Sequence, residues 1–386
     1  MGRSMFVIEE KGIIYDGSTG SQQERISFFT TLCKLDSGTI LCGFQNGPIK
    51  HSVSSTIKIC RSTDGGSTWL PTGKSFRTVI DGLPGSLSTA EMVEVFPGRV
   101  LLFATWFDRS EPERPLFDPV TEGILKSRQL VCVSVDEGLT WGDWQEITTG
   151  DLRGCSFTGP IIKWKDGVIA VPFESYKEYD DPGEKKHGAW LLVSSDGGYN
   201  FSRPLLVAQH PGHEIYYWDQ RLCRGMGDGD FFAFFWTHHL GKKCDLPVHF
   251  LKGRFFSSRL ICEPIRITSI PGQISAPLLL PDGNLIVFVV NRENPGSLTL
   301  WHSCDGGMSW PSEKNLVVHA HDERAVLSQG LKNIDFKQYW EDMGKWSFGH
   351  PVICQLSDEK ILLAWYAGAP DCMSIHWARI SLKGKA

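Results

Sequence analysis

One short segment of the chain gathers several side chains that could bind or react with a ligand. Residues 216–221 read Tyr-Tyr-Trp-Asp-Gln-Arg, which is an unusual composition for a buried strand. Aromatic faces suit stacking on rings, whereas the acid and the arginine suit recognition of hydroxyl and carboxylate groups. We therefore expect a functional site that includes Tyr217, Trp218, Asp219 and Arg221. An ordinary structural ion pair between the acid and the arginine is the alternative.

A second group of candidates lies where apolar runs of the sequence end. Glu174 follows the apolar run 168–173, so it is either a site carboxylate or the solvated end of a strand. His350, in the sequence Phe-Gly-His-Pro, is either a ligand-facing residue or a hydrogen-bonded turn residue. Polar residues where rigid elements meet loops are typical of binding sites. Further candidates in such positions are Glu91, Asp108 (which could instead pair with Arg109), His238, Gln273 and Arg292.

A repeated pattern of apolar runs must position these residues. The runs are interrupted by a tight polar turn six times, around residues 36–38, 97–98, 165–167, 228–229, 281–283 and 357–359. Turns of this kind between β-rich runs indicate hairpins. Their regular spacing predicts a repeat architecture of six four-stranded antiparallel blades.

A second repeat supports this organisation. Four copies of the pattern Ser-x-Asp-x-Gly-x-(Thr/Ser/Asn)-aromatic begin at Ser62, Ser134, Ser194 and Ser303. Each copy fits a hairpin turn in which the Asp accepts backbone N–H bonds and the Gly adopts a positive φ. A calcium loop would need oxygen ligands at alternate positions and a late bidentate Glu, which the repeat lacks. We expect structural turns without a bound metal, and nothing in the sequence indicates a cofactor.

This repeat is the Asp-box, and the chain resembles sialidase-type (neuraminidase-type, BNR-repeat) proteins over nearly its whole length. The resemblance implies an all-β fold, a six-bladed β-propeller of four-stranded antiparallel blades, with residues 1–386 forming one domain. The N-terminal stretch 5–15 is expected to complete the last blade, which would remove an exposed sheet edge. Two insertions are expected, a loop at 110–128 in the second blade and a segment at 311–347 before the sixth.

The resemblance also implies roles for three arginines. In sialidases an Arg-Ile-Pro strand supplies the first arginine of a triad that binds the sialic acid carboxylate, and Arg25 in Arg-Ile-Ser matches it. Arg221 and Arg292 lie in the blades where the other two belong. The loop 43–61, where the family has its general-acid Asp, contains no Asp or Glu, and the nucleophilic Tyr has no clear match.

Three functions are compatible with these residues. The main hypothesis is a glycoside hydrolase acting on an acidic sugar such as sialic acid or a uronate, with Glu174 and Asp219 as the two carboxylates that this chemistry requires and His350 beside them. The second is a polysaccharide lyase, in which His or Tyr removes a proton next to a uronate carboxylate neutralised by arginines. The third is a non-catalytic carbohydrate-binding propeller.

Composition narrows the partners and the location. The net charge is −5 and no basic stripe is visible, which argues against nucleic acid, so the expected partner is an acidic glycan. No apolar run approaches the length of a membrane span. The 11 cysteines are scattered singly, which favours free thiols in a reducing compartment. Because the N-terminus also lacks an apolar core of signal-peptide length, we expect a cytoplasmic protein.

Overall fold

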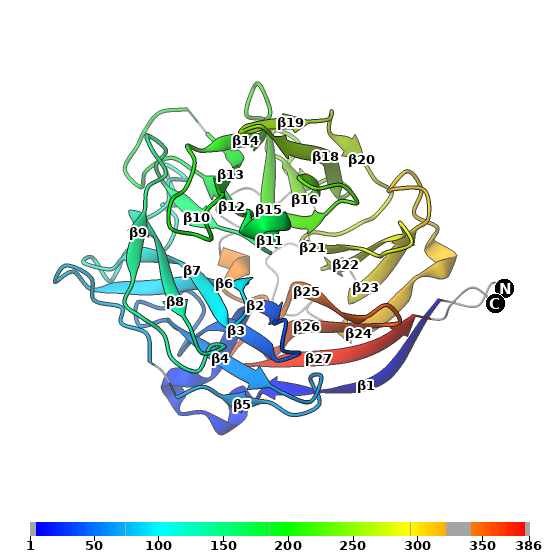
Figure 1. Ribbon diagram of the computed structural model, residues 1–386. Coiled ribbons are helices and arrows are strands. Elements are labelled where there is room, and N and C mark those ends of the chain that lie inside the picture. The colour runs from blue at the N-terminus through cyan, green and yellow to red at the C-terminus, as the bar shows by residue number, and fades with distance from the viewer. Residues whose placement is uncertain (1–4, 74, 185, 294, 322–340, 383–386) are drawn as a thin grey trace.

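The computed structural model describes residues 5–73, 75–184, 186–293, 295–321 and 341–382. These residues form antiparallel β-sheets connected by turns and short 3-10 helices, and the sheets are arranged around a common centre (Figure 1). All 11 cysteines are free. None of the helices in the described ranges has the length and apolar character needed to cross a membrane.

The first three units of sheet follow one another along the chain. The first consists of β2 (Ile26–Lys34), β3 (Ile40–Gly47), β4 (Thr56–Ser62) and β5 (Leu70–Pro71). The second consists of β6 (Gly85–Phe96), β7 (Arg99–Asp108), β8 (Ser127–Ser134) and β9 (Gln145–Ile147). The third consists of β10 (Cys155–Phe157), β11 (Ile162–Lys163), β12 (Ile169–Ser175), β13 (Gly188–Ser194) and β14 (Leu205–Ala208).

The remaining units complete the ring. The fourth consists of β15 (Ile215–Arg224), β16 (Asp230–His239), β17 (Cys244–Asp245), β18 (His249–Phe256), β19 (Arg259–Cys262) and β20 (Arg266–Ile267). The fifth consists of β21 (Ser275–Leu279), β22 (Leu285–Asn291), β23 (Gly296–Ser303) and β24 (Leu316–His321). The last consists of β25 (Phe348–Ser357), β26 (Lys360–Ala369), β27 (Cys372–Leu382) and β1 (Phe6–Tyr15). Short 3-10 helices are η1 (Gly17–Thr19), η2 (Gln22–Glu24), η3 (Lys165–Gly167) and η4 (Ser312–Lys314).

The two ends of the chain meet in the last unit. Strand β1 pairs antiparallel with β27, with Phe6 opposite Leu382 at one end of the ladder. The prediction that residues 5–15 complete the last sheet is therefore confirmed. The first and last units are also joined into one eight-stranded sheet by a parallel bridge between Ile26 and Met373.

The two expected insertions differ in outcome. Residues 110–128 form a loop between β7 and the start of β8. In the expected insertion 311–347, residues 316–321 are strand β24, which pairs with β23 and completes the fifth unit. Residues 322–340 lie outside the described part of the chain.

Separate clusters of buried apolar side chains fill the gaps between successive units. Leu41 of the first unit packs in one cluster with Leu102 of the second. Ile40 of the first unit packs in another cluster with Leu362 of the last, so the packing continues across the point where the chain closes. Burying a side chain of this size contributes about 1.5–3 kcal/mol. This packing between units holds the inner strands in fixed positions, and with them the side chains at the centre.

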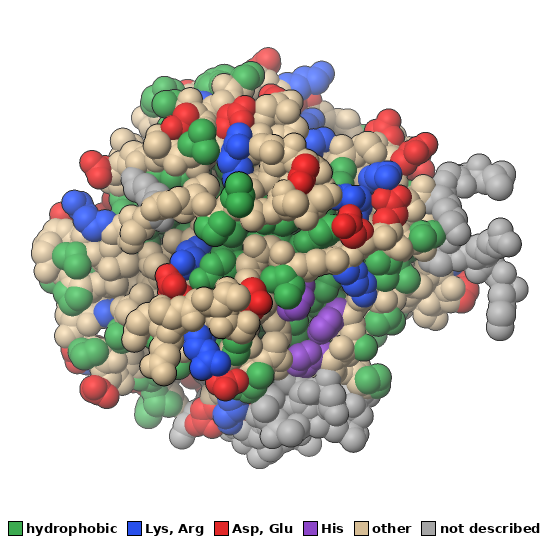
Figure 2. Space-filling view, turned by 90° about the horizontal axis from the view of Figure 1, so that it is seen from below, with side chains coloured by type: hydrophobic (Ala, Val, Ile, Leu, Met, Phe, Trp, Pro, Cys, Tyr) green, Lys and Arg blue, Asp and Glu red, His purple; other side chains and the backbone are tan. Residues whose placement is uncertain are grey.

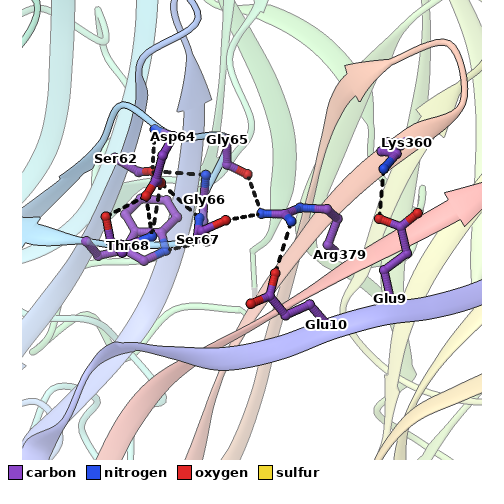
Figure 3. A network of polar contacts seen from close by, with 11 residues as sticks. Glu9, Glu10, Ser62, Asp64, Gly65, Gly66, Ser67, Thr68, Lys360 and Arg379 are labelled. Atoms are coloured by element: carbon purple, nitrogen blue, oxygen red, sulfur yellow. Dashed lines mark hydrogen bonds and ion pairs between the residues drawn. The ribbon is translucent and has the colours of Figure 1, made fainter.

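The four repeats form turns with one common hydrogen-bond pattern. In the first, Asp64 Oδ1 accepts the hydroxyl of Ser62 at 2.8 Å and the backbone N–H of Thr68 at 3.0 Å, and the Thr68 hydroxyl donates to Asp64 Oδ2 at 2.6 Å (Figure 3). These bonds, the Thr68 hydroxyl first, lower the pKa of Asp64 to about 2. The indole of Trp69 donates to the Gly66 carbonyl at 3.0 Å. Equivalent carboxylates in the other repeats are Asp136, Asp196 and Asp305.

The first of these turns is fastened to the closing strands. Arg379 of β27 donates to the carbonyl of Gly65 at 3.1 Å and to the hydroxyl of Ser67 at 2.7 Å, and it forms an ion pair with Glu10 of β1 at 3.0 Å (Figure 3). The turn therefore supports the closure of the ring as well as its own hairpin. Elsewhere the surface mixes charges, and Figure 2 shows basic and acidic side chains interspersed on one face.

We predict that Asp64→Ala lowers the free energy of unfolding by about 1–2 kcal/mol, because it leaves several turn donors without their acceptor. Urea denaturation measures the change. The matched control is Asp358→Ala, since Asp358 also lies in an exposed hairpin turn but accepts no described hydrogen bond. Equal losses in the two variants would contradict a structural role for the repeat.

Candidate functional site

The innermost strands surround a small cavity of about 90 Å³ at the centre of the ring. Aromatic side chains such as Phe28, Trp236 and Trp346 form part of its wall. Five of the predicted site residues also line it, namely Glu91, Glu174, Asp219, Arg292 and His350. They come from five different units of sheet, so only the closed ring brings them together.

A repeated irregularity of the inner strands aims side chains into this cavity. Strands β2, β6, β15 and β25 each shift register against their neighbour near their beginning. The residues at these shifts have positive φ and all line the cavity: Phe29 (53°), Thr89 (61°), Asp219 (46°) and His350 (49°). A β-bulge turns a side chain out of the regular alternation, and a positive φ is strained for residues other than glycine. The fold therefore maintains strain at this centre, which is typical of functional sites.

Glu174 is a deeply buried acid of the cavity. Its Oε1 accepts the backbone N–H of Gln220 at 3.2 Å, and its Oε2 accepts the hydroxyl of Tyr176 at 2.5 Å. Burial, and then the nearby charge of Asp219, raises the pKa of Glu174 to about 8. Glu174 is therefore largely protonated at neutral pH and able to donate a proton.

Two further carboxylates flank the guanidinium of Arg221. Glu91 Oε1 lies 3.8 Å from Arg221, and burial raises the pKa of Glu91 to about 7 although Arg221 and Thr31 act in the opposite direction. Asp219 Oδ1 lies 3.6 Å from Arg221, and its side chain is 22% exposed. Burial raises the pKa of Asp219, whereas the charges of Arg221 and Arg292 lower it. Asp219 is thus the acid that meets both solvent and positive charge.

His350 is held in a defined orientation. Its Nδ1 lies 2.9 Å from the carbonyl oxygen of Thr30, and its Nε2 is hydrogen-bonded to Arg221 Nη2. Since a carbonyl can only accept, Nδ1 carries the proton and Nε2 accepts from the guanidinium. Burial, followed by the charge of Arg221, holds the pKa of His350 well below its usual value. His350 is therefore neutral, and the lone pair on its Nε2 accepts a hydrogen bond from Arg221.

Arg292 is a buried cation whose donors are only partly used. It is 4% exposed, and its Nη2 donates to the carbonyl of Phe348 at 3.0 Å and lies 3.5 Å from the hydroxyl of Tyr366. Its guanidinium stacks 4.1 Å from the ring centre of Trp346. Nε and Nη1 have no hydrogen-bond partner among the described residues, and no described carboxylate forms an ion pair with Arg292. A buried charge of this kind is costly unless something compensates it, so the site suits an anionic ligand.

Lys50, Tyr176 and Tyr366 also line the cavity but are absent from the predicted set. Lys50 donates to the hydroxyl of Tyr366 at 2.9 Å, and Tyr176 contacts Glu174 as described above. Tyr176 follows β12, and Tyr366 lies in the second half of β26. Both tyrosines stand near the end of an apolar run, which is the same sequence signal that identified Glu174. In the described part of the chain, no group of three or more His, Cys, Asp or Glu side chains is arranged to hold a metal ion.

Other predicted residues form a network outside the cavity lining. The ring of Trp218 stacks on His238, with centroids 5.2 Å apart and an angle of 12°. Asp245 accepts from His238 Nδ1 and from Gln273 Nε2, both at 3.0 Å. The side-chain oxygen of Gln273 in turn accepts the backbone N–H of Arg292 at 3.1 Å. These hydrogen bonds help to position the backbone of Arg292. The acid that links them, Asp245, was not singled out from the sequence.

Three predicted residues lie away from the central cavity. Arg25 precedes β2 and lies four residues before the bulge at Phe29, so it falls short of the cavity wall. Tyr217 packs in the apolar cluster between the third and fourth units. Asp108 lines a separate surface hollow, and in the described structure no ion pair joins it to Arg109. The expected convergence of Arg25 with Arg221 and Arg292 is therefore not found.

Comparisons with known proteins identify the fold. No family model and no curated sequence matches the chain. A protein of unknown function from Dyadobacter fermentans is 16% identical, with a TM-score of 0.72 over 98% of this chain and 99% of that chain. A Hadza microbial sialidase is 14% identical, with a TM-score of 0.70 over 97% of this chain and 68% of that chain. The α-L-arabinanase of Penicillium chrysogenum, solved with arabinobiose, is 14% identical, with a TM-score of 0.64 over 98% of this chain and 100% of that chain. At these identities the likeness shows a shared fold, and it confirms the expected sialidase-like architecture at that level.

Proposed function

We propose that the protein is a glycoside hydrolase of the sialidase-like six-bladed β-propeller type, acting on an acidic sugar such as sialic acid or a uronate in the central cavity. Support for the fold comes from the antiparallel units arranged around a common centre, the pairing of β1 with β27, and the four turns of the Asp-box form. Structures named as a sialidase and an arabinanase share this fold, which is compatible with a carbohydrate ligand.

The observation that carries the proposal is that Arg292, which has unused hydrogen-bond donors, lines the same cavity as the acids. Arg221 is flanked by Glu91 at 3.8 Å and by Asp219 at 3.6 Å, so its charge is already compensated. Arg292 forms no ion pair with a described carboxylate, and its Nε and Nη1 have no hydrogen-bond partner among the described residues. A buried guanidinium of this kind favours a ligand that brings its own carboxylate, which Arg292 would hold by charge-assisted hydrogen bonds.

The two acids suit the two roles of glycoside hydrolysis. Neighbouring carboxyl groups readily share one proton, and the enclosed Glu174 retains it while Asp219, beside two arginines, carries the charge. Glu174 would protonate the departing glycosidic oxygen, and the hydroxyl of Tyr176 would stabilise the resulting carboxylate. Asp219 would attack the sugar or activate water.

Two of the histidines considered for the lyase alternative are already occupied. A lyase needs a base with an open lone pair near the sugar. His350 Nε2 is bonded to Arg221 and His238 faces Asp245 outside the cavity lining, which leaves His51 and the tyrosines of the cavity wall as candidate bases. A lyase would release an unsaturated product that absorbs in the ultraviolet, a hydrolase would release a reducing sugar, and a binding protein would show no turnover.

We predict that Glu174→Gln lowers kcat/KM by at least about 100-fold on glycosides with natural sugar leaving groups, because the general acid is lost. The loss should be much smaller on nitrophenyl glycosides of the same sugar, whose leaving group needs no proton. Release of reducing sugar and of nitrophenol from sialic acid and uronic acid glycosides measures both rates.

A matched control separates this effect from a general loss of structure. Glu94 is 4% exposed, as Glu174 is, but it accepts backbone N–H groups of Asp36 and Gly98 outside the cavity. Glu94→Gln should leave kcat/KM within about twofold. Equal losses in the two variants, or equal losses of Glu174→Gln on both leaving groups, would exclude Glu174 as the acid.

We predict that Glu174→Gln also changes how stability depends on pH. Because the pKa of Glu174 rises from 4.5 to about 8 on folding, the folded protein binds this proton more tightly than the unfolded chain does. Stability therefore falls as the pH rises from about 4.5 to about 8, and the glutamine variant should lack this part of the fall. Melting temperatures at pH 5 and pH 8 test this. A parallel pH dependence in both proteins would show that Glu174 titrates normally.

We predict that Arg292→Met raises KM for an acidic sugar by about 10- to 100-fold, since a hydrogen bond to a charged group contributes about 1.5–3 kcal/mol. Affinity for a neutral sugar such as arabinobiose should be unchanged or higher. Initial rates give KM for the acidic sugar, and calorimetry gives the dissociation constants of both ligands. An equal loss of affinity for acidic and neutral sugars would contradict carboxylate recognition.

A further inference from the structure

A second, larger cavity opens beside the central one. Its volume is about 630 Å³, and it shares four lining residues with the central cavity: Lys50, His51, Leu116 and Phe117. The rest of its wall comes mainly from residues 49–53 and from the loop 110–128. Because these four residues line both cavities, the outer cavity directly adjoins the central one.

The loop that forms this outer cavity is fastened in place. The ring of Phe117 packs against Tyr176, with centroids 5.3 Å apart. The backbone N–H of Ile124 donates to the carbonyl of Lys177 at 3.0 Å, and the hydroxyl of Thr121 donates to the carbonyl of Tyr179. The wall of the outer cavity is therefore anchored to the segment that follows β12 and is preformed.

Arg109 is a buried cation in the wall of the outer cavity. It is 5% exposed, and its Nε donates to the hydroxyl of Ser86 at 2.8 Å while its Nη2 donates to the carbonyl of His51 at 3.0 Å. Both partners are neutral, and no carboxylate forms an ion pair with Arg109 in the described structure. The two acids that line this cavity, Glu113 and Glu341, are exposed.

This lack of a counter-charge distinguishes Arg109 from its neighbour in the same wall. Arg114 forms ion pairs with Glu111 at 2.8 Å and with Asp180 at 3.0 Å. Charged side chains that are almost fully buried are usually paired, because desolvation is otherwise costly. The neighbouring His51 stays neutral, since burial and then the charges of Lys50 and Arg109 lower its pKa to about 3.

The two adjoining cavities thus present two buried guanidiniums that form no ion pair with a described carboxylate, Arg292 in the inner one and Arg109 in the outer one. We propose that the outer cavity binds a second acidic sugar unit, on the leaving-group side of the scissile bond, and that Arg109 recognises its anionic group. The substrate class is then an acidic oligosaccharide with adjacent charged units. The identity of the inner ligand as an acidic sugar rests on the proposed function.

Binding measurements on matched ligand pairs test the proposal. One pair is digalacturonic acid and its methyl ester at the reducing unit, and the other is α2,8-linked disialic acid and α2,3-sialylgalactose. Calorimetry is performed in the Glu174→Gln background so that bound sugars stay intact. We expect at least one dianionic ligand to bind about tenfold more tightly than its monoanionic counterpart, which corresponds to about 1.4 kcal/mol.

Two substitutions assign this difference to the outer cavity. Arg109→Gln should remove it and leave the affinity for the monoanionic ligand unchanged, whereas Arg109→Lys should keep part of it. Val53 is 41% exposed in the outer wall, so Val53→Glu adds a negative charge without disturbing the buried contacts of Arg109. Val53→Glu should also weaken only the dianionic ligand, and it serves even if Arg109→Gln fails to fold.

The outcomes separate this inference from the proposed function. Equal binding of the two members of each pair, or an equal loss for both in Val53→Glu, overturns the inference. A preserved difference in binding, with no hydrolysis by the protein with Glu174 intact, supports the inference and overturns the hydrolase proposal alone. Absence of binding by all four ligands overturns both.

Discussion

The centre of the ring depends on the guanidinium of Arg221, which is 1% exposed. Its charge is compensated by Glu91 at 3.8 Å, by Asp219 at 3.6 Å and by the hydrogen bond to His350. These partners stand on β6, β15 and β25, and His350 is tied further to Thr30 on β2. Removing one partner of a buried charge is costly, so the guanidinium holds four inner strands in one relative position.

This arrangement also sets the protonation of the site. Burial raises the pKa of both acids, but Arg221 and Arg292 oppose this rise at Asp219, whereas no cation is among the causes that act on Glu174, whose pKa rises to about 8. The two acids are pushed apart in acidity by their surroundings rather than by their own chemistry. The strained bulges at Asp219 and His350, of order 1–3 kcal/mol each, are sustained by the apolar packing between the units of sheet. The packing between the units therefore keeps the side chains of Asp219 and His350 in their orientations at the centre.

Much of the fold could be predicted because each unit of sheet has local sequence patterns that repeat along the chain. Turn residues recur at regular spacing, and Glu174, Arg292 and His350 were found because they stand where apolar strands end. The bulges could not be predicted. Strict alternation would place Tyr217, Asp219 and Arg221 on one face, but the positive φ of Asp219 breaks it, so Tyr217 packs between units while the other two turn inward. The same offset in β2 brings Phe29, and not Arg25, to the cavity.

Residues that act through long-range contacts left no local signal. Asp245 lies on a two-residue strand, and Lys50 lies in a loop, yet one orients His238 and Gln273 and the other reaches Tyr366 in the neighbouring last unit. Since proteins named as a sialidase and an arabinanase share this fold, the frame itself does not select a ligand. Selection must come from what is placed on the frame. In this chain a ligand with more than one negative charge is favoured by the anchored loop 110–128 and by the buried cations Arg109 and Arg292, which form no ion pair with a described carboxylate.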